Sequence, residues 1–349
     1  MNFFEWLLLP FIKEYKDLTD TEEKDNNNYF FNDGTPCTFD AKPIVAPVEV
    51  KTETKSSIFR PTKFSDYIGQ KEAKLILQNF ISGTRQRGLI FPHTLIHGSA
   101  GCGKTTLVNI ISHVLKVPVI ETITSDISDF ATLKQSIDKA QGGILFLDEI
   151  HSIERNNAEK LYTIMEDFTY NGLAVPQFTL IGATTELGEI IENRRPFYDR
   201  FKIIVGLKDY TLTDLATIIK QYQEKMFAKE RLDSHIYLHI AKNCRGTPRT
   251  AIRLLEATIY FNGDIAAVLQ SFDIIENGYT NTDLKLLKYL ASNDHTMGMQ
   301  SISTYLDTSS ANYLFSIEPY LLKTGMLIRT PRGRKISNDG IQLIERLGV

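Results

Sequence analysis

Between residues 59 and 205, short apolar runs alternate with longer amphipathic stretches. Apolar residues spaced three or four apart predict helices, the first of which we expect to bury Ala73, Ile76, Leu77 and Phe80. The apolar runs are typical of strands buried on both faces, and they lie at 94–97, 119–123, 144–147, 178–181 and 203–205. Strands that alternate with helices form a parallel sheet covered on both sides, so we expect an α/β fold.

Beyond residue 206 the pattern becomes helical and then ends in a basic hairpin. Helices are predicted at 211–229, 236–243, 249–261, 283–291, 299–306 and 311–324, and short strands at 326–328 and 335–337. Pro331 and Gly333 mark a tight turn between the two strands. Three helices followed by such a hairpin outline a winged helix, a relative of the helix-turn-helix. We therefore expect four regions: a flexible tail (1–56), an α/β domain (57–206), a helical domain (207–278) and a winged helix (279–349).

Composition narrows the class of protein. The 349 residues carry a formal net charge of -3, so any contact with nucleic acid must come from a local basic patch. The three cysteines are far apart in sequence and form no CxxC pair, which fits a reducing compartment. His235 and His239 have a spacing that can bind metal, but no third ligand is near, which favours ordinary surface or core histidines.

The first 56 residues differ from the rest. The apolar run at 3–12 is interrupted by Glu5 and Pro10 and is too short to span a membrane, and no basic segment precedes it. We therefore expect a cytoplasmic protein without a membrane segment. An Asp-, Glu- and Asn-rich stretch follows, which predicts a flexible tail. The apolar start could dock an unknown partner or fold back on its own domain, and composition leaves both open.

A phosphate-binding motif lies between a predicted strand and a predicted helix. Residues 98–105 read GSAGCGKT, which matches GxxxxGK[ST] in the context that the motif requires. Gly98, Gly101 and Gly103 allow backbone N–H groups to face phosphates. Lys104 would reach the β- and γ-phosphates of ATP, and the Thr105 hydroxyl would ligate Mg²⁺.

Two carboxylates end the strand at 144–147 and complete this site. Asp148 would hold the Mg²⁺ shell, and Glu149 would polarise the attacking water. A pair of acids at a strand end can also cap a helix, but the P-loop makes a catalytic pair the better interpretation. His151 follows closely, and we expect it to be a neighbouring contact without a catalytic role.

From about residue 59 to residue 344 the chain resembles RuvB, the bacterial Holliday-junction branch-migration ATPase of the AAA+ class. Beyond the P-loop, the resemblance rests on these runs: Arg60-Pro61, Tyr67-Ile68-Gly69-Gln70, LFLDEIH (145–151), MEDF (165–168), FTLIGATT (178–185), DRF (199–201), RGTPR (245–249), EPYL (318–321) and RTPRGR (329–334). It implies an AAA+ P-loop domain, a small helical lid and a C-terminal winged helix.

The resemblance also implies roles for single residues. Thr185 would sense the γ-phosphate, Arg200 would be an arginine finger that reaches into a neighbouring subunit, and Arg249 would couple the lid to the nucleotide. These residues would add to the nucleotide site: Phe59, Arg60, Thr106, Glu166, Asp167, Phe168 and Tyr210. A finger that acts in trans implies a ring, and members of this family form hexamers on DNA.

The basic turn of the winged helix is the expected DNA contact. Arg329, Arg332, Arg334 and Lys335 place four positive charges in seven residues with no acid among them. Such a turn suits phosphates or a minor groove, although a solvated basic turn would look the same. If all four contact phosphate, affinity should fall with salt at a log–log slope of about -3.6 per engaged subunit.

The chain departs from the family in three places. Only nine residues, 169–177, separate Phe168 from Phe178, where RuvB proteins carry a long hairpin that docks on RuvA, so a RuvA-like partner is doubtful. Tyr198 stands before the finger where arginine is common. The acidic N-terminal tail is also not a family feature.

The motifs leave three functions to be compared. The first is an ATP-driven translocase or helicase acting on duplex or branched DNA in recombination and repair. The second is an ATP-switched DNA-binding protein of clamp-loader or initiator type, which does not translocate. The third is a protein remodeller, against which the winged helix argues.

Overall fold

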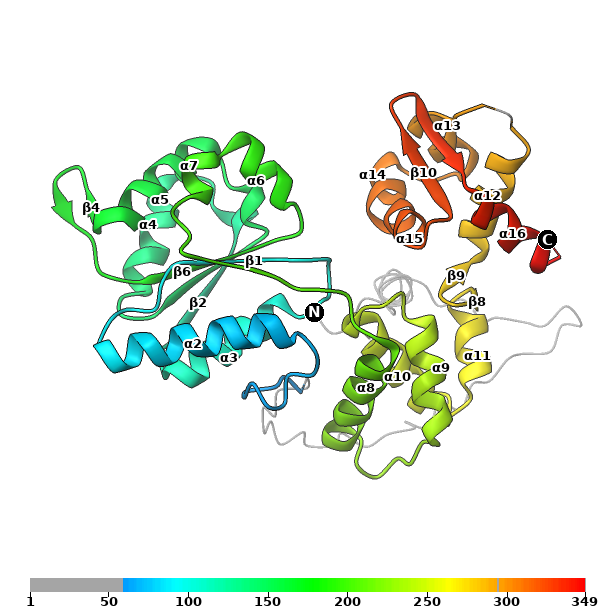
Figure 1. Ribbon diagram of the computed structural model, residues 1–349, viewed down its shortest axis with the longest axis horizontal. Coiled ribbons are helices and arrows are strands. Elements are labelled where there is room, and N and C mark those ends of the chain that lie inside the picture. The colour runs from blue at the N-terminus through cyan, green and yellow to red at the C-terminus, as the bar shows by residue number, and fades with distance from the viewer. Residues whose placement is uncertain (1–58, 294, 349) are drawn as a thin grey trace, which may run out of the picture. The chain divides into compact units, whose positions relative to one another are not determined.

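The computed structural model describes residues 59–293 and 295–348, and its first domain is built on a parallel sheet (Figure 1). The five strands take the order β2-β3-β6-β1-β7 and all run in one direction. Because the strands are parallel, the carboxyl ends of β1 and β3 lie at the same edge, separated only by β6. The strands are β1 (Thr94–His97), β2 (Val119–Ile123), β3 (Ile144–Asp148), β6 (Thr179–Thr184) and β7 (Ile203–Gly206).

Helices cover both faces of this sheet (Figure 1). Alternate residues of one strand enter different cores, because successive side chains point to opposite faces. Ile96 packs in the core that α2 and α3 share with the sheet, whereas Leu95 packs in the core formed with α4 and α5. The helices of the domain are α2 (Lys71–Arg87), α3 (Lys104–Leu115), α4 (Phe130–Lys139), α5 (Arg155–Asp167), α6 (Leu187–Asn193) and α7 (Arg195–Tyr198), with single 3₁₀ turns at Thr124–Asp126 and Ile150–Ser152.

The buried face of α2 differs from the expected one. Ala73, Leu77 and Ile81 are buried, but Ile76 and Phe80 are each 39% exposed. The prediction that Ile76 and Phe80 belong to the core was therefore wrong. The helix contacts its core along a single row, Ala73, Leu77, Ile81 and Thr84, which is narrower than the apolar stripe in the sequence.

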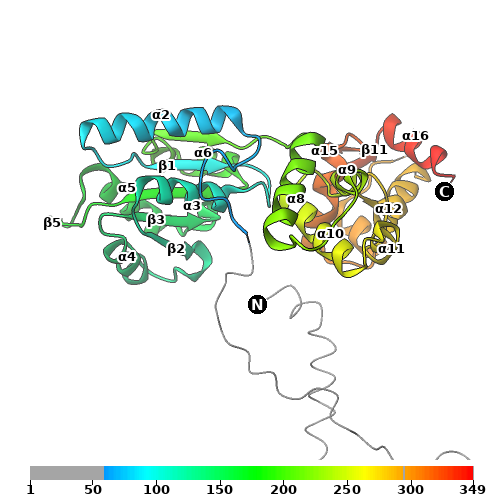
Figure 2. The same ribbon diagram turned by 90° about the horizontal axis from the view of Figure 1, so that it is seen from below.

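A second group of helices follows β7, which we call the lid. Figure 2 shows α8, α9 and α10 side by side. Thr211 and Thr247 cap the first and third of these helices, accepting hydrogen bonds from the backbone N–H groups of Asp214 and Thr250. The lid comprises α8 (Leu212–Met226), α9 (Ser234–Asn243), α10 (Pro248–Tyr260) and α11 (Ile265–Ser271), and a small hairpin of β8 (Ile274–Glu276) and β9 (Tyr279–Thr280) follows. That hairpin interrupts the all-helical pattern expected up to residue 278.

The C-terminal region is a winged helix, as the sequence predicted. Its predicted third helix, 311–324, is divided by a π-helix, because Pro319 has no N–H group to continue the regular hydrogen-bonding pattern. The two wing strands pair from Leu327–Ile336 to Thr330–Gly333. The elements are α12 (Asn281–Ala291), α13 (Met299–Tyr305), α14 (Ser310–Asn312), the π-helix Tyr313–Ile317, α15 (Glu318–Lys323), β10 (Leu327–Thr330), β11 (Gly333–Ile336) and α16 (Asn338–Arg346).

The predicted tail and its docking segment fall in residues 1–58, which lie outside the described residues. The described part of the chain forms one compact unit. Within residues 59–293 and 295–348, no helix combines the length and the apolar character that crossing a membrane requires.

Candidate nucleotide site and wing

The P-loop folds into a cradle that only glycine can form. Gly101 and Gly103 have φ angles of 74° and 99°, in the left-handed region. A Cβ atom on Gly103 would lie 2.9 Å from the Tyr67 hydroxyl, and one on Gly101 would lie 2.9 Å from Cβ of Arg249. The loop therefore lets the lid and Tyr67 approach the backbone that would hold phosphates.

Lys104 begins α3 directly under this loop. Its side chain is buried, and Nζ donates hydrogen bonds to the carbonyl oxygens of Gly98 (2.9 Å) and Ser99 (3.3 Å). Backbone carbonyls hold the ammonium group without neutralising its charge. Lys104 therefore stays available to a triphosphate anion that enters the cradle.

The acidic pair lies at the end of β3, as predicted. Glu149 has a φ angle of 49°, which is uncommon for a residue other than glycine and stores strain. Its Oε2 accepts a hydrogen bond from the Thr185 hydroxyl (3.0 Å) and lies 3.3 Å from Nδ1 of His151. Thr185 and Glu149 are thus brought together, and His151 is a direct neighbour of the carboxylate that is expected to activate water.

One cavity joins the predicted motifs. Its volume is about 220 Å³, and it opens between the P-loop, the end of β3 and the start of α10. Asp148 and Thr105 both line it, so a carboxylate and a hydroxyl lie beside the phosphate cradle, and oxygen donors of this kind fit Mg²⁺. The lining residues are Arg60, Ala100, Gly101, Gly103, Lys104, Thr105, Thr106, Asp148, Glu149, Pro248, Arg249 and Ile252.

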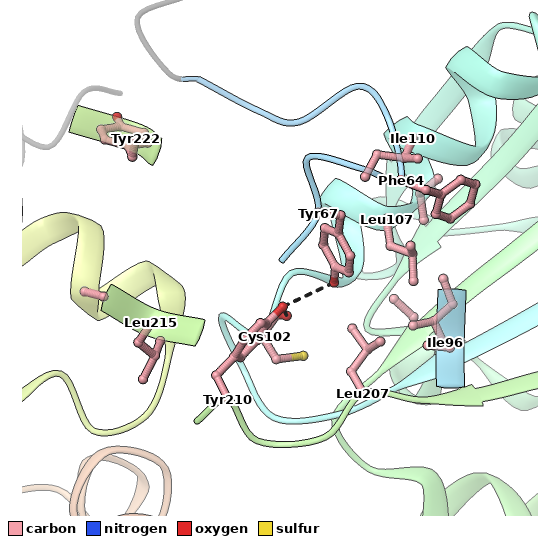
Figure 3. Packing of buried hydrophobic residues seen from close by; sticks show 14 of the residues in the cluster. Phe64, Tyr67, Ile96, Cys102, Leu107, Ile110, Leu207, Tyr210, Leu215 and Tyr222 are labelled. Atoms are coloured by element: carbon pink, nitrogen blue, oxygen red, sulfur yellow. Dashed lines mark hydrogen bonds between the residues drawn. The ribbon is translucent and has the colours of Figure 1, made fainter. Parts of the chain in front are cut away.

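An adjoining, more apolar pocket of about 80 Å³ shares Gly103 and Thr106 with this cavity. Phe59 and Tyr210 line it, as the resemblance implied. Figure 3 shows Tyr67 and Tyr210 beside Cys102 of the P-loop, and the Tyr210 hydroxyl donates to the carbonyl of Cys102 (3.0 Å). Burial raises the pKa of both tyrosines, so both hydroxyls stay protonated and can donate hydrogen bonds.

Sequence reasoning missed Tyr67 and Tyr222 as pocket residues. Both rings line the apolar pocket. The sequence contained a signal for Tyr67, which begins the run YIGQ just before α2. Tyr222 lies one helical turn after Ile218, also in the pocket lining, so helical spacing on α8 could have found it.

Arg200 lies outside the cavity of its own chain. Its Nη2 atom is 2.8 Å from Oε2 of Glu166, and the two side chains are 33% and 61% exposed. Asp167 accepts hydrogen bonds from Thr169, and Phe168 packs against Phe178. Glu166, Asp167 and Phe168 therefore do not line the cavity, and their role in nucleotide binding stays a prediction.

The wing uses one of its arginines internally. Arg334 donates to both oxygens of buried Glu318, at 2.8 and 3.2 Å, and the two hydrogen bonds raise its pKa. Arg334 was expected to bind DNA, but its guanidinium is already occupied inside the domain. Arg329 lies 3.7 Å from the same carboxylate with a side chain 59% exposed, and Arg332 and Lys335 are exposed. The predicted DNA contact therefore rests on Arg329, Arg332 and Lys335.

The short loop after α5 has the length that the sequence predicted. Two strands of two residues each, β4 (Thr169–Tyr170) and β5 (Leu173–Ala174), close around Asn171 and Gly172. Both turn residues have positive φ angles, as a two-residue hairpin turn requires. Leu173 is 73% exposed on this hairpin.

A parallel sheet of this strand order, a P-loop facing an acidic strand end, a helical lid and a winged helix together define an AAA+ ATPase with a DNA-binding type of domain. Residues 59–207 match the model of the Holliday junction DNA helicase RuvB P-loop domain, and residues 276–345 match the RuvB C-terminal winged helix domain. The chain belongs to the RuvB family.

Similar proteins support this assignment over most of the chain. The chain is 34% identical to the Holliday junction branch migration complex subunit RuvB of Prochlorococcus marinus, covering 84% of this chain and 89% of that protein. It is also 34% identical to the RuvB subunit of a Wolbachia, covering 86% of this chain and 97% of that protein. The solved structure described as the Thermotoga maritima RuvB Holliday junction branch migration motor has a TM-score of 0.72 at 31% identity, covering 82% of this chain and 98% of that one.

Proposed function

We propose that this protein hydrolyses ATP to drive DNA through a ring of its own copies and that its substrate is branched DNA of the Holliday-junction type. The single observation that carries the proposal is the cavity in which the P-loop, Asp148, Glu149 and Arg249 meet. The exposed arginines of the wing supply the DNA contact. The proposal places the protein in the cytoplasm, with the DNA.

The phosphate side of the cavity would bind and orient the triphosphate. Backbone N–H groups of the glycine loop and the Lys104 ammonium face the negative charge. Mg²⁺, held by Thr105 and the shell around Asp148, would neutralise charge on the β- and γ-phosphates when it is bound. The adjoining aromatic pocket suits a purine base, because its walls are apolar and partly stackable.

Glu149 would activate the water that attacks the γ-phosphate. In the structure its carboxylate is shared between the Thr185 hydroxyl and His151, which fixes its direction. Arg200 would complete the site from the neighbouring protomer, because in its own chain it faces Glu166 outside the cavity. Because each site then needs an arginine from the next copy, we expect the copies to assemble into a ring.

The proposal is tested with Glu149→Gln. Removing the base should lower ATP turnover by about 10²- to 10⁴-fold while nucleotide binding is retained. Exposed Glu154 provides the matched control, since Glu154→Gln changes an acid whose side chain caps no helix. A Glu149→Gln variant with the parent's turnover contradicts the mechanism.

The DNA substrate needs its own assay. Parent protein and Glu149→Gln are compared for strand displacement on a synthetic four-way junction and on linear duplex. The proposal predicts ATP-dependent displacement of the junction by the parent alone. Assembly on DNA without displacement would identify an ATP-switched DNA-binding protein instead.

A further inference from the structure

Arg245 lies in the lid but bonds mainly to the region that follows it. Its Nε donates to the carbonyl of Gly278 (2.9 Å), Nη1 to the carbonyl of Ser316 (3.2 Å), and Nη2 to Oδ2 of Asp283 (2.5 Å). The guanidinium also lies over the ring of Tyr320, 4.8 Å from its centroid. One side chain thus contacts the β8–β9 turn, α12, the π-helix and α15.

Asp283 makes this junction a buried one. The residue is fully buried, and its Oδ2 also accepts from the backbone N–H and the hydroxyl of Thr280, which forms the capping box of α12. Its Oδ1 is buried without a hydrogen-bond partner among the described residues. Burial raises the pKa of Asp283, whereas the charge of Arg245 and the hydrogen bonds from Thr280 oppose the shift and favour the charged carboxylate.

The other end of the same segment reaches the nucleotide cavity. Arg249 is four residues after Arg245, lines the cavity, and closes on Gly101 of the P-loop. Only three residues separate the two arginines: Gly246, Thr247, which caps α10, and Pro248, which fixes its first turn. A displacement of the start of α10 would therefore act on Arg245 as well.

We propose that Arg245 is a positioning residue that couples nucleotide state to the winged helix: it clamps the start of the winged helix to the segment that ends in Arg249. The inference rests on the proposed function, since it assigns the route by which ATP binding would move the DNA-binding domain. The planar fork of arginine is essential to the role, because three separate acceptors are engaged at once.

A second, exposed contact joins nearby parts and provides the control. Lys323 of α15 lies 2.8 Å from Asp209, which precedes Tyr210 in the segment between β7 and α8, and the side chains are 36% and 58% exposed. Exposed pairs contribute little. Lys323→Gln therefore removes an ion pair in the same region without removing the buried clamp.

The test variant is Arg245→Met combined with Asp283→Asn. The double change removes both charges, so no buried charge is left unpaired, and the asparagine oxygen still caps α12. Arg245→Lys is the second variant, which keeps the charge beside Asp283 but cannot reach Gly278 and Ser316 together. Thermal unfolding of all variants shows that each is folded before coupling is measured.

Coupling is measured in the full-length protein by hydrogen exchange of α12 and α15, with and without a non-hydrolysable ATP analogue. In the parent and in Lys323→Gln, the analogue should change the exchange rates by about 5- to 150-fold, the usual range for coupled sites. In the double variant and in Arg245→Lys the change should fall below about twofold, a difference of at most about 0.4 kcal/mol, while the affinity for the analogue is unchanged.

The proposal would be overturned by a parent winged helix that does not respond to nucleotide, by a double variant that responds as the parent does, or by full retention of the response in Arg245→Lys. Loss of analogue binding in the double variant would also overturn it, because Arg245 would then support the cavity itself. None of these readouts uses DNA, so a parent that fails to displace strands would contradict the proposed function and leave this result standing.

Discussion

The nucleotide cavity and the wing both contain clustered cations, but the cations have different partners. In the cavity, Lys104 is held by carbonyl oxygens of its own loop, which leaves its charge free for a ligand. In the wing, Arg334 faces the buried carboxylate of Glu318 and its charge is neutralised inside the domain. Residue type and motif are therefore insufficient to identify a ligand-binding cation. The partner must also be known.

Substitution of Arg200 should have the largest effect. Like Arg334 in the wing, Arg200 pairs with a carboxylate, but the carboxylate of Glu166 is exposed. Exposed pairs are weak, so we expect the finger to leave Glu166 readily. Arg200→Ala should lower ATP turnover by about 10³-fold or more if the residue acts as a finger. Steady-state ATPase assays of the assembled protein measure this.

Mixing variants shows whether the finger acts in trans. Arg200→Ala and Lys104→Ala are each expected to be inactive alone, but a mixture pairs an intact P-loop with an intact finger from the adjacent subunit. Recovered turnover in the mixture is expected. A mixture no more active than the sum of its parts contradicts the ring. Glu159, whose pair with Arg155 is exposed, is the control, and Glu159→Gln should change turnover by about fivefold at most.

Glu318 provides the next largest effect. Glu318→Ala leaves the side chain of Arg334, only 12% exposed, without its carboxylate, which should cost about 3 kcal/mol of unfolding free energy. Glu276, whose pair with Arg346 is exposed, is the matched control, and Glu276→Ala should cost less than about 1 kcal/mol. Urea unfolding measures the stability of both variants. Equal losses of stability would show that the buried pair of Arg334 contributes no more than the exposed pair of Arg346.

His93 is a titratable side chain that is buried and hydrogen-bonded within the first domain. Its Nδ1 accepts a hydrogen bond from the backbone N–H of Leu180, and burial lowers its pKa to about 4. The unfolded chain binds this proton below about 6.5, so between these values the unfolded state holds more protons. The stability that His93 contributes should be complete above pH 6.5 and fall by about 2 kcal/mol as the pH decreases to 5.

The measurement is urea unfolding of the parent and of His93→Gln at pH 7 and pH 5. The variant should lose most of the pH dependence assigned to this side chain. His113, which is exposed on α3, serves as the comparison, and His113→Gln should keep the parent's slope. A His93→Gln protein with an unchanged slope assigns the titration to other groups.

The smallest expected effect is on DNA affinity. Arg332→Ala removes one exposed cation and should reduce the log–log salt slope of DNA binding by about 0.9 per engaged subunit. Arg334→Ala should not change the slope in this way, because its charge is already paired. Fluorescence anisotropy with duplex DNA over a salt series measures both, and equal changes would show that Arg334 leaves Glu318 to bind DNA.

Much of the fold was predictable because its strands carry short apolar runs and its helices are periodic. The site was predictable where a motif has a fixed length, as in the P-loop, since spacing alone places Lys104 at a helix start. The other features have different causes. The third winged-helix segment is divided near Pro319, a local signal that its apolar spacing obscured, whereas the pairing of Arg334 depends on a contact with Glu318, sixteen residues earlier.

The same limit applies to the exposed face of α2 and to the residues after α5. Ile76 and Phe80 have the spacing of core residues, yet the packing row passes beside them. Glu166 belongs to a run shared with the family, but in this chain it meets Arg200 and not the cavity. The sequence pattern shows which side chains lie on one face of a helix or strand. Which residues those side chains contact is decided by how the other helices and strands pack against that element.

The alternation along β1 makes the strand intolerant of any change in length. Deleting one residue from Thr94–His97 would turn Leu95 and Ile96 toward the opposite helical layers, exchanging the contents of both cores in one step. It would also draw the glycine loop about 3.3 Å back along the sheet, away from Asp148. Insertions and deletions should therefore be tolerated in the β4–β5 turn. A one-residue insertion or deletion in β1 should abolish folding and nucleotide binding together.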